Sequence, residues 1–323
     1  MADSAPSASV IIPNYNGLRF LQTCLDALLA QTYPAVRTEI ILVDDASSDN
    51  SVAFVTEHYP EVKIVQLARN SGLAIGCNAG ARAAAGDLLV MLNNDTEAEP
   101  GWLAALVDAA LAHPEAGAIG SKMLLFDRRD TLHNAGDLMG IDGIPRNRGV
   151  WQHDAGQFDA DPVIFGGCGG GVMYRRTAWE QAGGFDERLF MYLEDVDLAW
   201  RLRLQGWGAV YAPAARLYHR LSATGGGVLA SYYVGRNTIW VIAKDMPGLL
   251  IRRHLGPIAR AQWRITRDAL RAWRGDSARA RLRGQLAGVA GLPKVLGWRK
   301  QVQATRCVPI GDLDRLLARD ARN

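Results

Sequence analysis

Two short clusters of carboxylate and amide side chains are the parts of this sequence whose types and spacing could do chemistry. The first is Asn93-Asn94-Asp95, which directly follows the apolar run 88–92. Such a run, preceded by Gly86, is typical of a fully buried strand of a parallel sheet. Ligands bind at the carboxyl edge of such sheets, where a hard carboxylate suits a divalent cation that holds phosphates. The same triplet is also typical of an ordinary strand-to-helix turn.

The second cluster is Glu194-Asp195, at the start of a predicted helix that runs to about residue 205. Asp195 shares a helical face with Leu198 and Leu202, so we expect its carboxylate to point inward from the first turn. A carboxylate there could act as a general base, and near a helix N-terminus it would stay ionised at neutral pH. Acidic residues are also common in first turns because they suit the helix dipole.

Other titratable residues are expected at the surface. Asp197 and Arg201 are spaced i, i+4 on the same helix and predict an exposed ion pair. His133 and His153 are isolated within the irregular stretch 122–162, which we expect to form loops or a hairpin over the sheet. Both histidines are therefore interpreted as surface residues rather than ligands.

The elements that must position these residues follow from the alternation of apolar runs and helical patterns. We predict strands at 9–12, 39–43, 62–67, 88–92, 116–121, 172–174 and 208–211, with helices in most of the intervals. This alternation, at roughly 25–30 residues, indicates a doubly wound, mostly parallel α/β sheet. A dinucleotide-binding loop is excluded because no G-x-G-x-x-G follows the first strand. Gly72, Gly76 and Gly80 have instead the spacing of a helix face that packs closely, and no P-loop is present.

Composition limits the classes of protein to consider. The chain has 323 residues, 49% of them hydrophobic, which is enough for one large α/β domain and an appendage. Its four cysteines are far apart and form no C-x-x-C pair, so neither a disulfide framework nor a zinc site is indicated. The N-terminal residues lack the pattern of a signal peptide, and no apolar run could span a membrane. A cytoplasmic protein is expected.

Charge divides the chain into two parts. Residues 245–323 contain fifteen Arg and two Lys against six Asp, a net charge of +11 that leaves −8 for residues 1–244. We therefore predict a domain at 1–244 and a basic amphipathic helical tail at 245–323, divided into helices by Pro257 and Pro293. Arginines interleaved with Leu, Ile and Trp are typical of a membrane-surface segment. Nucleic-acid binding and a solvated face packed on the acidic domain are the alternatives.

Taken together, the motifs resemble family 2 glycosyltransferases of the inverting GT-A type. Within that family they are most similar to bacterial rhamnosyltransferase-like enzymes of cell-surface glycan synthesis. The matching stretches are VIIPNYNG (10–17), ILVDDASSDNS (41–51), NSGLAIGCNAG (70–80), LLVMLNNDT (88–96), GGFDERLFMYLEDVDLAWRLRLQGW (183–207) and residues 209–219. They are collinear and cover residues 9 to about 240.

The resemblance implies a role for each matching residue. Tyr15 would lie against the nucleotide base, and Asp45 would accept a hydrogen bond from it. Asp95 would ligate Mg²⁺ or Mn²⁺ on the donor diphosphate, His219 would be a second metal ligand, and Asp195 would be the base that deprotonates the acceptor hydroxyl. The further donor-binding residues implied are Pro13, Asn16, Asn78, Asn93 and Asn94, and the acceptor-binding residues are Gly169, Gly170 and Glu194.

One departure and one absence qualify the resemblance. Asn93 and Asn94 stand where the family's D-x-D motif has its first two positions, so the metal has fewer carboxylate ligands than in a full motif. No Q-x-x-R-W motif is present, which favours transfer of a single sugar over polymerisation. The resemblance implies a donor such as dTDP-rhamnose or a UDP-sugar, a glycan or lipid-linked acceptor, and a place at the inner face of the cytoplasmic membrane. A non-catalytic scaffold that binds nucleotide sugars is the competing hypothesis.

Overall fold

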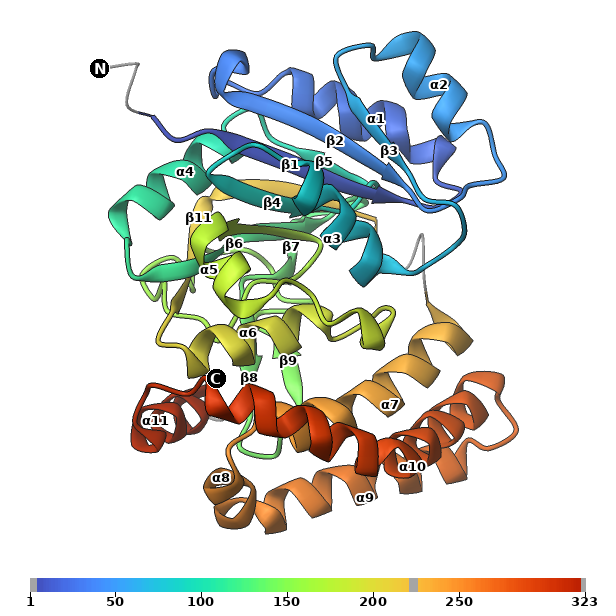
Figure 1. Cartoon of the computed structure of the whole chain (residues 1–323), viewed down its shortest axis with the longest axis vertical. Helices are drawn as coiled ribbons and strands as arrows, with labels where there is room; N and C mark the ends of the chain where they lie inside the picture. The colour runs from blue at the N-terminus through green and yellow to red at the C-terminus, as the bar shows by residue number, and fades with distance from the viewer. Residues whose placement is uncertain (1–4, 221–225, 321–323) are drawn as a thin grey trace.

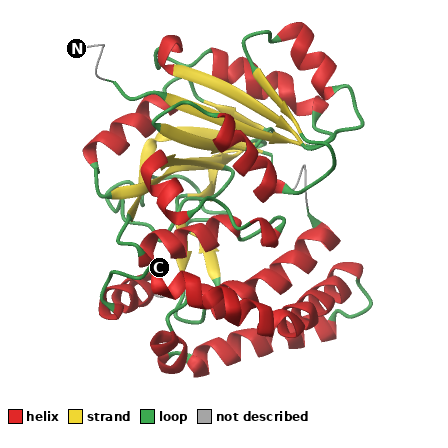
Figure 2. Cartoon of the chain, in the orientation of Figure 1, coloured by secondary structure: helices red, strands yellow, loops and turns green. Residues whose placement is uncertain are grey.

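The computed structural model describes residues 5–220 and 226–320, and within them a nine-stranded sheet organises the molecule (Figures 1 and 2). The strands are β1 (Ala8–Asn14), β2 (Thr38–Asp44), β3 (Lys63–Gln66), β4 (Leu88–Leu92), β5 (Thr96–Ala98), β6 (Ala116–Leu125), β7 (Arg128–Asn134), β10 (Gly171–Arg175) and β11 (Gly208–His219). A separate two-stranded ribbon pairs β8 (Asp137–Met139) with β9 (Pro145–Asn147).

The helices that surround the sheet are α1 (Leu18–Leu29), η2 (Ala35–Arg37), α2 (Ser51–His58), α3 (Leu73–Ala83), α4 (Trp102–Ala112), α5 (Arg176–Ala182), η3 (Glu187–Leu189) and α6 (Glu194–Leu204). Helices α1, α3 and α4 follow strands and return the chain along the faces of the sheet, as the sequence predicted. Gly80 of α3 lies so close to β1 that an added Cβ would stand 2.3 Å from Ile11. The predicted close packing of this helix face is confirmed.

The sheet order is β3-β2-β1-β4-β10-β6-β11-β5, with β7 paired to β6. Strands β1 to β4 are parallel, and β11 is parallel to β6, so the predicted mostly parallel α/β fold is confirmed. Strand β10 runs antiparallel between β4 and β6. The chain enters β10 from the loops after β9 rather than from a crossover helix, and so it enters from the opposite edge of the sheet.

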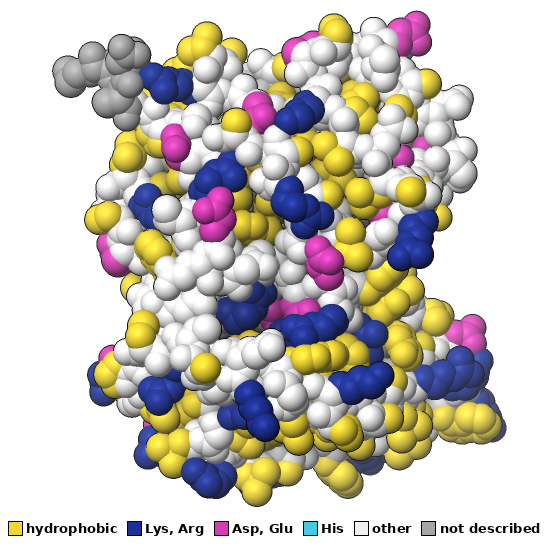
Figure 3. All heavy atoms as spheres, in the orientation of Figure 1, with side chains coloured by type: hydrophobic (Ala, Val, Ile, Leu, Met, Phe, Trp, Pro, Cys, Tyr) yellow, Lys and Arg dark blue, Asp and Glu magenta, His cyan; other side chains and the backbone are white. Residues whose placement is uncertain are grey.

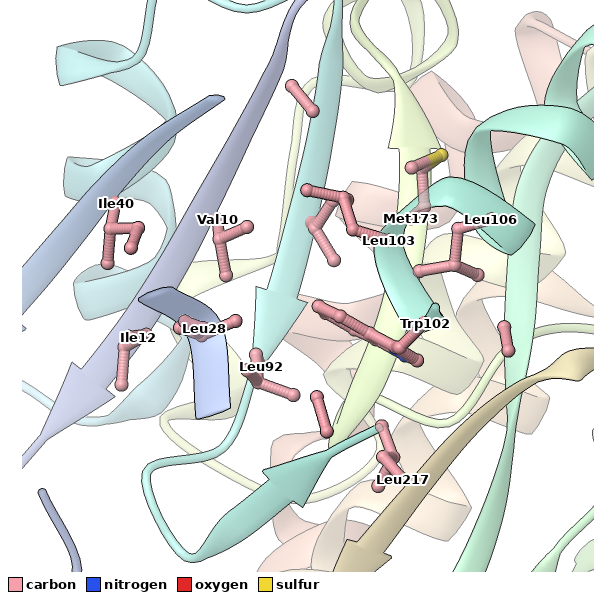
Figure 4. Packing of buried hydrophobic residues seen from close by; sticks show 14 of the residues in the cluster. Val10, Ile12, Leu28, Ile40, Leu92, Trp102, Leu103, Leu106, Met173 and Leu217 are labelled. Atoms are coloured by element: carbon pink, nitrogen blue, oxygen red, sulfur yellow. The ribbon is translucent and has the colours of Figure 1, made fainter. Parts of the chain in front are cut away.

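Buried aliphatic residues on both faces of the sheet form the core. On one face, shown in Figure 4, Val10 and Leu92 point toward helices α1 and α4, where Trp102 and Leu106 cover the sheet. The Trp102 indole nitrogen donates to Ser121 Oγ at 2.9 Å, which satisfies the polar atom of this fully buried ring. Because β1 and β4 are covered on both faces, their sequences are continuous apolar runs.

The stretch 122–162 is more regular than the sequence indicated. Strand β6 continues to Leu125 and forms a hairpin with β7, and the β8–β9 ribbon extends from the sheet toward the C-terminal helices (Figure 1). Strand β11 also continues past Pro213, across a register shift between Ala212 and Arg216, and ends at His219. The residues that were expected after a turn therefore lie in the sheet.

The C-terminal helices form a layer at one end of the molecule (Figures 1 and 2). They are α7 (Gly227–Asp245), α8 (Gly248–Arg253), α9 (Leu255–Arg271), α10 (Asp276–Ala304) and α11 (Ile310–Asp320). Pro257 stands in the first turn of α9, as expected for a helix start, but Pro293 lies inside α10 and does not divide it. Gly284 of α10 lies against the backbone of Tyr232, so α10 packs along α7 and stays continuous. Among the described residues, no helix is long and apolar enough to cross a bilayer.

A buried group of charges joins this layer to the sheet. The predicted exposed pair of Asp197 and Arg201 is instead buried, with Arg201 Nε donating to Asp197 Oδ2 at 2.8 Å. The expectation of exposure was wrong because α7 covers this face of α6 and brings Lys244 against Asp197 and Asp186. The boundary between a domain at 1–244 and a tail at 245–323 stays a prediction.

Candidate active site

Side chains at the carboxyl ends of β1, β2 and β4 are joined by hydrogen bonds. Asn94 Nδ2 donates to Asn14 Oδ1 at 2.7 Å, and Asn14 Nδ2 donates to Asp44 Oδ1 at 3.1 Å. Asp44 Oδ2 accepts from the backbone amide of Ser47 at 3.0 Å. The three strands are parallel, so their ends meet at one edge, and this buried chain of polar contacts fixes the loops that leave it.

Asp45 is held at the same edge by two backbone amides. Its oxygens accept hydrogen bonds from the amides of Ser71 and Gly72 at 2.7 and 2.8 Å. Gly72 has φ +91°, a conformation that favours glycine, and it begins α3. Asp45 therefore orients the loop after β3, and each of its oxygens retains lone pairs for a further donor.

The residues after β1 have different environments. Tyr15 is half exposed and lies at the surface of this edge. Asn16 has φ +51°, and its Oδ1 accepts from the amides of Ser48 and Asp49 at 2.8 and 3.2 Å. Pro13 is opposite Val43 in the parallel register of β1 and β2. Asn16 thus ties two loops together, while Tyr15 is available to a ligand.

Asn78 is buried on α3, and its amide contacts protein groups on both sides. Its Nδ2 donates to the carbonyl of Phe185 at 2.9 Å and to Glu187 Oε1 at 3.0 Å, and its Oδ1 accepts from the amide of Phe185 at 2.9 Å. Asn78 therefore connects the helix that follows Gly72 with the segment that leads to Glu194 and Asp195.

The two predicted metal ligands lie side by side. His219 ends β11 and Asp95 follows β4, and His219 Nε2 lies 3.2 Å from Asp95 Oδ1. Asn93 Nδ2 is 3.3 Å from the same ring nitrogen. Adjacent ligands of an octahedral ion at about 2.1 Å stand about 3 Å apart, so this pair fits one Mg²⁺ or Mn²⁺. Within residues 5–220 and 226–320, no group of three or more potential protein ligands is present, so donor phosphates and water would complete the coordination.

His133 was predicted at the surface, and that expectation was wrong. The residue ends β7 beside β6, is 7% exposed, and its ring stacks on His219 with centroids 4.9 Å apart. Burial, together with the neighbouring His219, lowers the pKa of His133 to about 4. A neutral His133 therefore packs behind the His219 ring. His153 lies at the surface, as predicted.

Asp195 stands in the first turn of α6, half-buried, with its carboxylate turned toward the glycine-rich loop. Its Oδ2 accepts from the amide of Gly169 at 2.8 Å, and its Oδ1 accepts from the amide of Val196 at 2.8 Å. Burial raises the pKa of Asp195, and these two hydrogen bonds oppose that shift. An added Cβ on Gly169 would lie 3.2 Å from Asp195 Oδ2, so a larger residue here would press on this carboxylate.

Gly170 and Glu194 are the sequence neighbours of Gly169 and Asp195, which a hydrogen bond joins. The carbonyl of Gly170 accepts from the amide of Asn93 at 3.2 Å, which places the glycine loop beside the metal-ligand candidates. Glu194 is buried at the start of α6, and burial together with the charge of Asp195 raises its pKa well above the usual range. The structure thus brings all three predicted acceptor residues to one side of the edge.

Asp137 is a second carboxylate at this site that the sequence did not single out. Burial raises its pKa well above the usual range, and the charge of Asp195 raises it further. Asn134 Nδ2 donates to its Oδ1 at 2.6 Å. Asp137 begins the β8–β9 ribbon and also forms an isolated bridge with Gly166, which comes much later in the sequence. The only signal for it was a polar Asn and Asp around a glycine, within a stretch without periodicity.

A strained segment precedes the helix of Asp195. Phe190, Tyr192 and Leu193 have φ between 65° and 66°, which is rare for bulky residues. Asn237 of α7 is fully buried, and its Nδ2 lies 2.7–3.2 Å from three carbonyls of the segment, those of Leu189, Met191 and Tyr192. A side chain from the C-terminal layer therefore holds the backbone that positions Asp195.

These elements can be compared with known proteins. The model of the family described as "Glycosyl transferase family 2" matches residues 9–183, which include β1 to β10 of the sheet. The chain belongs to this family. As a family 2 member it is a nucleotide-sugar-dependent glycosyltransferase with a GT-A fold.

Curated relatives include enzymes of surface-glycan synthesis. The chain is 34% identical over 234 residues to the O-antigen biosynthesis protein RfbC of Myxococcus xanthus, a match that covers 68% of this chain and 18% of that protein. It is 31% identical over 252 residues to the N-acetylglucosaminyl-diphospho-decaprenol L-rhamnosyltransferase of Mycobacterium tuberculosis, covering 70% and 79%. The family 2 chain is thus similar to rhamnosyltransferase-like proteins.

Solved structures agree on the fold. GalNAc-T7 with UDP, GalNAc and Mn²⁺ aligns with a TM-score of 0.62 at 18% identity, over 75% of this chain and 48% of that one. The mannosyltransferase PcManGT of Pyrobaculum calidifontis, with GDP-Man and Mn²⁺, aligns over the whole of this chain and 82% of its own, with a TM-score of 0.52 at 19% identity. At these identities the likeness concerns the fold alone.

Proposed function

We propose that this family 2 enzyme transfers a single sugar, with inversion, from a nucleotide-sugar donor to a hydroxyl of a glycan or lipid-linked acceptor. The observation that carries the proposal is the position of Asp195. Its carboxylate is half-buried, is held by the amide of Gly169, and lies at the same sheet edge as Asp45 and Asp95. A base and a donor-phosphate site on one edge are the two parts that such a transfer requires.

In this proposal Asp195 removes the acceptor proton. The acceptor oxygen forms a bond to the anomeric carbon while the bond from that carbon to the donor phosphate breaks. The proton moves to Asp195, and the nucleoside diphosphate leaves with the bonding electrons. The attack comes from the face opposite the leaving group, so the configuration inverts. Burial raises the pKa of Asp195, which makes its carboxylate a stronger base than a solvated aspartate.

The donor would be held by residues on the β1–β4 side of the edge. Tyr15 lies against the base, and Asp45 accepts a hydrogen bond from it. Asp95 and His219, with the Asn93 amide beside them, would hold Mg²⁺ or Mn²⁺. When bound, such a cation neutralises negative charge on the leaving diphosphate. Asn78 and Asn94 act through the loops that they tie together.

The proposed donor sugar rests on the similarity of this chain to named relatives. One relative is named a rhamnosyltransferase that acts on an N-acetylglucosaminyl-diphospho-decaprenol, and this supports dTDP-rhamnose over a UDP-hexose and a lipid-linked acceptor. The alternative donor is a UDP-sugar, since UDP occupies similar folds in GalNAc-T7 and in TarS of S. aureus.

The C-terminal helices would hold the enzyme at the inner face of the cytoplasmic membrane. Basic side chains alternate with exposed apolar ones over this layer, at the bottom of Figure 3. Trp263, Leu270 and Trp273 are each more than half exposed on or next to α9. Arginine near exposed tryptophan and leucine suits the interface of an anionic bilayer.

The proposal is tested by thermal unfolding with dTDP, UDP, GDP and CMP, each with and without Mn²⁺. A ligand that binds only the folded protein raises the melting temperature according to its affinity. We expect a shift with dTDP or UDP that increases when Mn²⁺ is present. Absence of a shift with every nucleotide would contradict the donor site described above.

A further inference from the structure

A groove between the β8–β9 ribbon and α9 lies outside the donor site. It has a volume of about 780 Å³, and the ribbon contributes Gly140, Ile141, Asp142 and Arg146. Helix α9 contributes Pro257, Arg260, Ala261, Trp263, Arg264 and Arg267. Four guanidinium groups therefore line one groove together with a single carboxylate.

Two of these arginines are not neutralised. Arg146 is paired with Asp142, and Arg267 donates to Asp268 at 3.1 Å while its guanidinium lies 5.1 Å from the Trp263 ring. Arg260 and Arg264 are exposed, and within the described part of the chain no carboxylate lies in ion-pairing distance of either. Their i, i+4 spacing places both on one face of α9, where they can bind one multiply charged anion.

The groove is connected to the site of transfer by a short strand. Strand β8 begins at Asp137, the carboxylate whose pKa is raised by burial and by Asp195, and the chain reaches Ile141 four residues later. An extended chain of that length spans at most about 13 Å. Ile141 also packs against the cluster that contains Val196 of α6. Strand β8 therefore leads from the carboxylates at the site of transfer to the groove.

Exposed apolar side chains that could contact a lipid chain lie beside the groove. Trp263 lines the groove and is 63% exposed, and Leu270 and Trp273 continue the apolar surface along the same helix. A lipid chain that leaves a diphosphate in the groove would meet this surface at the proposed membrane interface. The charge of the groove, its connection to Asp137 through β8 and the apolar surface beside it all point to the same type of ligand.

We infer that the groove formed by β8–β9 and α9 binds the diphosphate of a lipid-linked acceptor, with Arg260 and Arg264 as its ligands. The inference rests on the proposed function and assigns its acceptor a second contact. The enzyme would then select its acceptor at two places. Asp195 would contact a sugar hydroxyl, and the groove would bind the diphosphate ester. Anionic phospholipid and free diphosphate share this chemistry, so the experiment must separate them.

The test compares two pairs of exposed arginines in the C-terminal layer. Arg260→Gln with Arg264→Gln changes the groove. Arg271→Gln with Arg274→Gln removes the same charge at the end of α9 and just after it, outside the groove. Full-length proteins are floated with neutral phosphatidylcholine vesicles, with such vesicles containing a small fraction of undecaprenyl diphosphate, and with vesicles rich in phosphatidylglycerol. Free diphosphate is added as a competitor, and a cooperative thermal unfolding transition without ligand shows that each variant is folded.

We expect the groove pair to weaken binding to undecaprenyl diphosphate vesicles about tenfold or more, and the control pair by less than about threefold. Both pairs should weaken binding to phosphatidylglycerol alike. Equal losses for the two pairs on diphosphate vesicles, or no competition by excess free diphosphate, would overturn the inference. If nucleotides fail to bind while the difference between the pairs persists, the proposed function fails and the groove assignment stands.

Discussion

Two opposing effects act on the pKa of the Asp195 carboxylate. Burial raises its pKa, whereas the amides of Gly169 and Val196 donate hydrogen bonds that favour the ionised form. A general base needs both effects. The hydrogen bonds keep it ionised before the reaction, and burial increases its affinity for the proton during the reaction. The Gly169 contact also fixes the direction from which an acceptor hydroxyl can approach.

Replacement of this carboxylate should separate binding from transfer. We expect Asp195→Asn to lower kcat by about 10²- to 10⁴-fold, because the amide cannot accept the proton. The melting shift caused by nucleotide and Mn²⁺ should be unchanged, since Asp195 contacts neither. Asp108→Asn, an exposed residue of α4, serves as the control and should leave kcat unaltered. A rate of transfer close to that of the wild type would place the base elsewhere.

The sequence indicated many of these residues because they directly follow strands. Asp45, Asp95 and His219 each stand at the carboxyl end of a strand, and parallel strands bring such ends together. Asp137 and His133 could not be found in this way. The distant partner of His133 is the ring of His219, and that of Asp137 is the bridge to Gly166, so local periodicity reveals neither contact.

At the scale of elements, α7 positions the segment before α6. The three unusual φ values at Phe190, Tyr192 and Leu193 persist only because surrounding groups fix them. Asn237 provides the donors, and the Phe190 ring stacks on Tyr233 of the same helix with centroids 5.2 Å apart. We therefore expect helix α7 to affect transfer through the segment that it holds.

Removal of the Asn237 amide should reduce the rate of transfer by more than the loss of stability alone would explain. We expect Asn237→Leu to destabilise the protein by about 1–3 kcal/mol, because the carbonyls of the segment lose their donor. We also expect kcat to fall about 10- to 100-fold, with nucleotide affinity retained, as Asp195 is displaced. Thr238→Val is the control, since Thr238 donates only to the carbonyl of Val234 within its own helix. If both variants lose stability and neither loses kcat, Asn237 has only a structural role.

Helices and parallel strands were predictable at this scale, and three features were not. The antiparallel direction of β10, the continuation of β11 beyond Pro213 and the passage of α10 through Pro293 all contradict local expectation. Each depends on packing between distant segments. Contact along α7 outweighs the helix hydrogen bond that Pro293 removes.

At the scale of the whole molecule, Lys244 joins the helical layer to the sheet. It is 1% exposed and contacts Asp186 before α6 and Asp197 within it, beside Arg201. Burial alone would raise the pKa of Asp186, but the hydrogen bond from Arg188 and the charge of Lys244 hold it well below the usual range. The stability that this carboxylate contributes is therefore present at neutral pH and is lost as pH falls below about 4.

Loss of the buried ammonium should be costly for the fold. We expect Lys244→Met to lower the free energy of unfolding by about 3–5 kcal/mol, because Asp186 and Asp197 lose a buried partner. Lys300→Met, an exposed residue of α10, should change it by less than about 0.5 kcal/mol. Urea unfolding at neutral pH measures both. A small effect at Lys244 would mean that water enters the cluster and replaces the lysine.

The contact between Asn237 and the segment before α6 has a consequence for protein engineering. A chimera that exchanges acceptor-side helices between two members of this family would place a foreign α7 against a native segment 189–193. The three carbonyls would then lack their matching donor, and the chimera would fold with a displaced base. Exchange of residues 185–193 along with α7 keeps the donor and its acceptors from one parent, so a single exchanged block should begin before Phe185 and end after Asp245.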